Sequence, residues 1–383
     1  MREVIFLLAL ASANGGIALR AVEPMLPRLA SDFGTSVSHA AVIISAYAVS
    51  YACSQLVYGP LGDRFGKLRV VTLSLVGAAV GCFACALAPG IEALAALRLF
   101  TGLFASTPVL LGMAYIADRV PASERQPVIA RFVIGTITGQ ALGPAIGGAT
   151  TDLVGWRGTF ELIGAVYAVV CVILLARTRG QWAEEKPRVF PGPPFAIHLR
   201  LLRYSRVRHV VAVGFIETFI FFGAFSFLGA YLKERFDLSL TAIGAILAGF
   251  GLGGVLYTLL VKRLLRGLGQ RGLVVAGGAS AFAAYTLAML TPVPGVFVVC
   301  TVSLGFAFYM LHNTVQVKAT EMAPEARATG LALYSAGWAL GQAIGVAAMG
   351  LAVSVAGYRV PIIAFGACYL LLGLWMRRNL ERL

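Results

Sequence analysis

Two ionisable residues, Glu217 and His312, lie inside long apolar segments, where a charged side chain is costly to bury. Glu217 lies about ten residues into the segment 208–231, so a helix rising about 1.5 Å per residue places it near mid-membrane. A carboxyl there suits the uptake and release of a proton; the alternative is a neutral carboxyl bonded to a neighbouring helix. Because imidazole changes charge close to neutral pH, His312 is a second proton-coupling candidate, with interhelical hydrogen bonding as the alternative.

Three more charged residues interrupt apolar segments in the first half of the chain. Arg98 lies about 8 Å inside one end of the segment 93–115, so it needs a cavity or a partner unless it reaches back to the membrane surface. Arg20 and Glu23 are three residues apart just before Pro24, and this spacing favours a local ion pair near the outer surface. Arg98 and Glu23 join the proton-coupling candidates.

Amides and aromatic rings in the apolar segments are candidates for lining a substrate cavity. Gln140 and Gln342 occupy equivalent places in the two halves and would either line the cavity or bridge helices. Phe221 follows Glu217 by four residues and shares its helical face, whereas tyrosines in the segments are expected to pack. The cavity candidates are Asn14, Arg20, Gln55, Gln140, Phe219, Phe221, Phe222, Asn313, Gln316 and Gln342.

The elements that must position these side chains are membrane-spanning helices. The chain is 59% hydrophobic and only 13% charged, and segments of about 20 apolar residues match the thickness of a bilayer core. Twelve such segments are predicted, at 4–23, 39–59, 70–89, 93–115, 127–149, 157–177, 208–231, 239–262, 272–291, 294–316, 328–350 and 358–377. The sequence therefore predicts an all-α polytopic membrane protein with no soluble catalytic domain.

The net charge of +14 is concentrated in the loops on one side of these segments. Under the positive-inside rule that side is cytoplasmic, which places both termini in the cytoplasm and predicts a multi-pass protein of a bacterial inner membrane. The charge reports topology and attraction to anionic membrane lipid, so no nucleic-acid partner is expected.

The two halves of the chain repeat each other at an offset of 202 residues. The sequence Gly139-Gln-Ala-Leu-Gly143 returns as Gly341-Gln-Ala-Ile-Gly345, and other matches share the offset. They are Arg125 with Arg327, Gly135 with Gly337, Gly148 with Gly350, Gly155 with Gly357, Arg157 with Arg359 and Tyr167 with Tyr369. A duplicated unit of six helices predicts two bundles related by a pseudo-twofold axis along the membrane normal, with a cavity between them.

The longest polar stretch divides these halves. It predicts a bundle at 1–179, a cytoplasmic linker at 180–206 and a second bundle at 207–383. Two similar bundles suit alternating access, in which they rock about a central site.

The loop 59–69 reads G-P-L-G-D-R-F-G-K-L-R, and here the chain resembles the major facilitator superfamily, whose signature at this loop is G-x-x-x-D-R-x-G-x-x-R. The resemblance implies a latch that closes the cytoplasmic side. Its aspartate would face helix 11, and its first arginine would pair with an acidic residue at the end of helix 4. The latch residues are Gly59, Asp63, Arg64, Gly66, Arg69 and Asp118.

A glycine stripe in the segment 127–149 sharpens the resemblance. By itself the stripe indicates only close helix packing, with a proline that can bend the helix. Its pattern G-x-x-x-G-P-x-x-G-G resembles that of the drug:H⁺ antiporter branch, and the whole chain looks like the arabinose (sugar) efflux permease group within it. The stripe comprises Gly135, Gly139, Gly143, Pro144, Gly147 and Gly148.

These features predict a secondary active transporter, a proton-coupled antiporter that exports a small amphipathic molecule, either a drug or a sugar-like metabolite. The alternative within transport is a facilitator or symporter of a sugar or small metabolite. A membrane-embedded enzyme would need a clustered motif such as G-x-S-x-G, which is lacking, and a sensor would be expected to carry a soluble signalling domain. We expect no metal and no cofactor, the proton as coupling ion, and a monomer.

Overall fold

The computed structural model describes residues 2–182 and 196–382, and the middle of the predicted linker lies outside this range. Within it the chain forms helices and short 3-10 turns, without a strand. The first half contains α1 (Arg2–Arg20), α2 (Leu26–Asp32), α3 (Val37–Ala40), α4 (Val42–Phe65), α5 (Lys67–Ala86), α6 (Ile91–Ala105), α7 (Thr107–Arg119), α8 (Ala122–Thr178) and η1 (Arg179–Gln181). The second half contains α9 (Ala196–Leu201), α10 (Ser205–Phe225), α11 (Leu228–Phe236), α12 (Leu240–Leu290), α13 (Val296–Glu321), η2 (Pro324–Ala326), α14 (Arg327–Ala356), α15 (Arg359–Asn379) and η3 (Leu380–Arg382).

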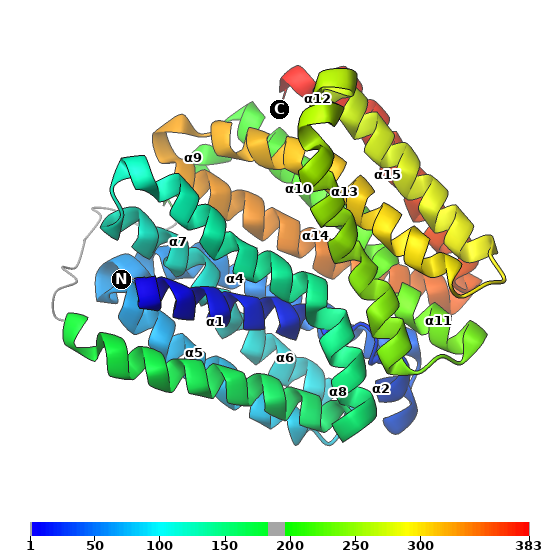
Figure 1. The fold of residues 1–383 in the computed structure, drawn as a ribbon, viewed down its shortest axis with the longest axis horizontal. Coiled ribbons are helices and arrows are strands. Elements are labelled where there is room, and N and C mark those ends of the chain that lie inside the picture. The colour runs from blue at the N-terminus through cyan, green and yellow to red at the C-terminus, as the bar shows by residue number, and fades with distance from the viewer. Residues whose placement is uncertain (1, 183–195, 383) are drawn as a thin grey trace.

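Ten apolar helical spans in the described residues are long enough to cross a membrane. Two of them, 131–178 and 240–290, are long enough to cross twice. Each is interrupted by a glycine with positive φ, Gly155 at 76° and Gly269 at 62°, and the chain turns back there (Figure 1). The described residues therefore make twelve crossings, as the sequence predicts.

Several crossings consist of two helical pieces in series. After α1 the chain passes through a turn into α2. The helix is interrupted there because Pro24 and Pro27 lack the N–H that a continuous helix needs. The span that is long enough to cross a membrane is Arg2–Arg20, so Arg20 ends it and Glu23 lies in the turn that follows. Both side chains are buried inside the protein, and their place near the outer surface of the membrane stays a prediction.

The glycine stripes pack in the same way in both halves. A Cβ placed on Gly139 of α8 would lie 2.0 Å from the carbonyl oxygen of Ala13, and one on Gly341 of α14 would lie 2.2 Å from that of Phe215. Gly341 and Phe215 are each 202 residues after their counterparts. The backbones of α8 and α1, and of α14 and α10, therefore approach more closely than any side chain at these glycines allows.

The interface between the halves obeys the same symmetry. Gly148 packs against the carbonyl of Leu240 in the other half, and Gly350 packs against Ser38. Each residue of one contact is the other's counterpart at an offset of 202, so the contact occurs twice with the halves exchanged. This reciprocity confirms two bundles related by a pseudo-twofold axis.

The two halves are joined toward one end of the molecule. We call the end with both chain termini the arginine-rich end and the other end, which contains α2 and α11, the distal end (Figure 1). Three sets of hydrogen bonds join the halves toward the distal end. Thr241 N and Oγ1 donate to Asp152 Oδ2 at 2.7 Å, Ser226 Oγ donates to Glu23 Oε1 at 3.2 Å, and Ser45 Oγ donates to Ala343 O at 2.7 Å.

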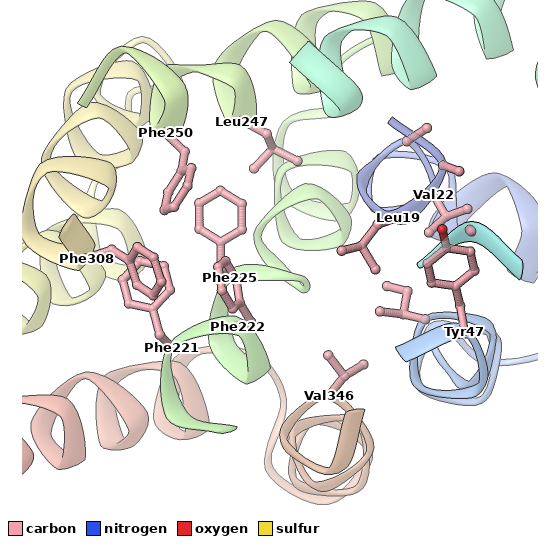
Figure 2. Packing of buried hydrophobic residues seen from close by; sticks show 14 of the residues in the cluster. Leu19, Val22, Tyr47, Phe221, Phe222, Phe225, Leu247, Phe250, Phe308 and Val346 are labelled. Atoms are coloured by element: carbon pink, nitrogen blue, oxygen red, sulfur yellow. The ribbon is translucent and has the colours of Figure 1, made fainter. Parts of the chain in front are cut away.

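The buried core crosses this junction. Figure 2 shows aromatic rings of the second half gathered on one side and apolar residues of the first half on the other. The labelled residues are Phe221, Phe222, Phe225, Leu247, Phe250, Phe308 and Val346 from the second half, and Leu19, Val22 and Tyr47 from the first.

Candidate functional site

The structure brings the two main proton-coupling candidates into contact. Nδ1 of His312 on α13 lies 3.2 Å from Oε2 of Glu217 on α10. Glu217 is completely buried, and His312 is 12% exposed. A buried carboxyl beside a partly accessible imidazole can exchange a proton along their shared hydrogen bond.

Two tyrosines complete this group, which we call the second-half centre. The hydroxyl of Tyr334 lies 3.5 Å from the same Nδ1 of His312, so that nitrogen can donate to Glu217 in one tautomer and accept from Tyr334 in the other. Tyr369 faces the Glu217 carboxyl and interacts with it, although the Tyr369 hydroxyl and Glu217 Oε1 make no hydrogen bond of normal geometry among the described residues. Phe308 stacks on the imidazole at 4.7 Å and fixes the plane of the ring.

Sequence reasoning missed the role of these tyrosines. Tyr369 matches Tyr167 at the repeat offset, yet tyrosines were expected to pack. The signal that could have identified Tyr369 is the same offset applied to Glu217, which falls on Gly15. In the first half Tyr167 faces Gly15, as Tyr369 faces Glu217 in the second.

Arg98 anchors a corresponding group in the first half, which we call the first-half centre together with Tyr47, Tyr167 and Gly15. The guanidinium is fully buried and lies 4.0 Å from the centre of the Tyr47 ring and 5.7 Å from that of Phe160. Arg98 therefore does not reach the membrane surface. None of its three nitrogens has a hydrogen-bond partner among the described residues.

Arg20 and Glu23 form the expected ion pair and also contact the second half. The Arg20 guanidinium lies 4.0 Å from the ring centre of Phe222, and Glu23 accepts a hydrogen bond from Ser226. The pair is buried at the junction of the halves, so any separation of the distal end must break its contacts with Phe222 and Ser226.

Three of the six amides among the cavity candidates are buried, namely Asn14, Gln55 and Gln342. Asn14 donates to the carbonyl of Ile163 at 3.0 Å and so bridges α1 and α8 within one half. Gln55 is buried on α4, and Gln140 is partly exposed where α8 packs against Gly16. Gln342 is buried, and no described group hydrogen-bonds to its amide, so it bridges no helices in this state.

A cavity of about 380 Å³ lies between α12 and α13 toward the arginine-rich end. Asn313 and Gln316 contribute to it, together with apolar side chains such as Val261 and Leu265. Two of the predicted cavity residues therefore line one amphipathic pocket, a turn of α13 away from His312.

The three phenylalanine candidates separate. Phe221 is buried, with its ring 5.3 Å from Tyr369, as a residue on the face of Glu217 should be. Phe222 contacts Arg20 at the junction. Phe219 points elsewhere and stacks at 5.7 Å on Phe365 of α15, where it packs α10 against its neighbours.

The latch residues pair differently from the pattern that the resemblance implies. Lys67 Nζ lies 2.7 Å from Asp118 Oδ2 and 3.1 Å from Asp63 Oδ1, so it takes the place expected of Arg64. The Arg64 guanidinium instead lies 5.2 Å from the Phe65 ring. Gly66 has φ of 92°, which explains a glycine at this turn. Gly59 and Arg69 lie beside the turn in α4 and α5.

A family model of the Major Facilitator Superfamily matches residues 5–326 and 210–382. The chain belongs to this superfamily. Its members are transporters, which bind small-molecule substrates within the membrane.

Relatives and solved structures agree with this assignment. The uncharacterized MFS-type transporter YceJ of Bacillus subtilis is 26% identical over 371 residues, which cover 94% of this chain and 92% of YceJ. The MFS antiporter QDR3 of Candida albicans is 28% identical over 171 residues, 45% of this chain and 24% of QDR3. The crystal structure of a bacterial homolog of the human lysosomal transporter Spinster, inward-facing and unoccupied, has the same fold, with a TM-score of 0.76 at 18% identity over 100% of this chain and 98% of that one.

Proposed function

We propose that this protein exports a small amphipathic molecule across a bacterial inner membrane in exchange for protons, with Glu217 as the proton carrier. The observation that supports this most is the hydrogen bond between the buried Glu217 and the partly exposed His312. A charge that a membrane protein buries and pairs with a titratable group is suited to coupling.

This contact supports the following cycle. Protonation of Glu217 removes the charge that holds His312, so the imidazole is free to turn toward Tyr334. Substrate in the adjacent cavity displaces the proton, which leaves through His312 toward the side that is open. With the halves joined at the distal end, that side is the arginine-rich end, which we place in the cytoplasm on the positive-inside rule.

The proposal of antiport and export also rests on similarity to known transporters. The glycine–proline stripe of α8 resembles that of proton-coupled exporters, and one relative carries the name of an antiporter. We place Arg98 outside the proton path, because its ring contacts, Tyr47 and Phe160, lie in the first half.

Purified protein in liposomes tests the proposal. We expect a pH gradient to drive uphill movement of at least one of riboflavin, ethidium and arabinose. Glu217→Gln should abolish uphill movement and keep downhill exchange, because an amide holds hydrogen bonds without titrating. Glu161→Gln, which changes an exposed carboxyl on α8, is the matched control and should behave as wild type.

The alternative, a facilitator or symporter, makes a different prediction in the same liposomes. Downhill movement of one of these compounds that ignores the pH gradient in the wild type would establish the facilitator. Uphill movement along the proton gradient would establish the symporter.

A further inference from the structure

The first-half centre contains a buried positive charge without a matching negative one. Arg98 is fully buried about 10 Å from the start of α6, and its three guanidinium nitrogens have no partner among the described residues. The face of the Tyr47 ring stabilises the cation but accepts none of its N–H bonds in the usual geometry. A buried charge with unmet donors needs an acceptor.

Hydroxyl groups lie beside it. The Tyr47 hydroxyl donates a long hydrogen bond of 3.3 Å to Gly15 O and also faces the buried Tyr167 hydroxyl, which makes no hydrogen bond of normal geometry among the described residues. Arg98 interacts electrostatically with both tyrosines. A guanidinium and hydroxyl groups are the kinds of donor that bind an anion.

The repeat identifies the group that is lacking. The counterpart of Gly15 in the second half is Glu217, whose carboxyl faces Tyr369 as Gly15 faces Tyr167. A side chain starting at Gly15 would meet only two neighbouring atoms within 4 Å, Ala105 O at 3.1 Å and the Tyr167 hydroxyl at 3.4 Å. Where the second half has its own carboxylate, the first half therefore has a glycine that contacts two tyrosines. Both tyrosines interact with Arg98, which has no hydrogen-bond partner among the described residues.

We propose that the first-half centre is a binding site for a monovalent anion, which takes the place that the Glu217 carboxylate has in the second half. The anion is either a free ion of halide size or the carboxylate of a transported molecule. It binds to the Arg98 guanidinium and the hydroxyls of Tyr47 and Tyr167. Its exchange depends on opening of the distal end, and in that respect the site rests on the alternating access of the proposed function.

Thermal unfolding of the purified protein tests occupancy without any transport. At equal ionic strength, we expect sodium chloride or sodium benzoate to raise the unfolding midpoint by about 3 °C over sodium gluconate. A response to chloride assigns the site to a free anion, and a response to benzoate alone assigns it to a carboxylate on an apolar body. Arg98→Gln should lose the response, whereas Arg157→Gln, at an exposed arginine, should keep it.

Two more variants cover the case in which Arg98→Gln does not fold. Gly15→Glu supplies the carboxylate internally and should unfold at the same midpoint in all three salts. Arg98→Lys keeps the charge and should retain part of the response. Equal midpoints for the wild type in the three salts, or a full response in Arg98→Gln, would overturn the anion site and leave proton-coupled export untouched.

Discussion

The two halves of this transporter share a backbone plan but differ in charge at equivalent positions. In the second half, Glu217 is paired with His312 and surrounded by tyrosines. In the first half, the equivalent position is Gly15, and the buried charge of that centre is Arg98, which has no hydrogen-bond partner in the part of the chain that the structure describes. Duplication preserved the packing, since glycines at an offset of 202 touch backbone atoms at the same offset. The contrast indicates that one half carries a group that can change charge and the other a charge that is fixed.

The largest loss of stability is expected when Arg20 is left without its acidic partner, as Arg98 is among the described residues. Glu23→Gln leaves Arg20 buried and unpaired, as Arg98 is, and should lower the free energy of unfolding by about 3–5 kcal/mol. Arg20→Met with Glu23→Leu should cost less, since it leaves no buried charge. Unfolding by detergent titration measures both. A negligible loss in Glu23→Gln would mean that this protein tolerates unpaired buried charges, and the comparison would lose its meaning.

The next prediction tests whether the glycine contacts of α8 and α14 contribute equally to stability. Gly139→Ala and Gly341→Ala should each lower the free energy of unfolding by about 1–3 kcal/mol, because the added Cβ overlaps a backbone carbonyl in both. Gly267→Ala, where nothing lies within 4 Å of the added atom, should be stabilising by up to about 1 kcal/mol. A large loss in only one half would show that the repeat in packing is superficial.

The third prediction concerns the partner of the carboxyl. His312→Asn should reduce pH-driven uphill transport by about tenfold, the effect of losing a charge-assisted hydrogen bond worth about 1.5 kcal/mol. Downhill exchange should persist. If this variant loses all uphill transport while Glu217→Gln keeps it, the proton carrier is His312.

The smallest effect is expected at the loop between α4 and α5. Asp63→Asn removes a partly exposed ion pair with Lys67, worth about 0.5–1 kcal/mol, and should slow transport by about threefold at normal abundance. Asp237→Asn removes a pair of the same i, i+4 spacing with Lys233 at the C-terminal end of α11 and should have no effect. If Asp63→Asn has the turnover of the wild type, the loop connects α4 and α5 and does not act as a latch.

Periodicity and charge predicted the fold well. The twelve crossings follow from the lengths of the apolar segments, and the repeat follows from the spacing of the glycines. Burial was harder to predict. The sequence predicted the Arg20–Glu23 ion pair but not its burial against Phe222 and Ser226 of the other half. Contacts between helices far apart in the sequence could not be predicted. Glu217 and His312 were therefore separate candidates, and Tyr334 was not among the candidate residues. The boundaries at 179 and 207 and the proton-coupling roles stay predictions.

Proton release on substrate binding tests the difference between the halves most directly. Purified protein in a weakly buffered detergent solution with a pH-sensitive dye would receive the compound that proves to be transported. We predict that the wild type and Arg98→Gln release protons on binding, while Glu217→Gln binds and releases none. Release from Glu217→Gln equal to that from the wild type, or its loss in Arg98→Gln at retained binding, would contradict the assignment of the mobile charge to the second half.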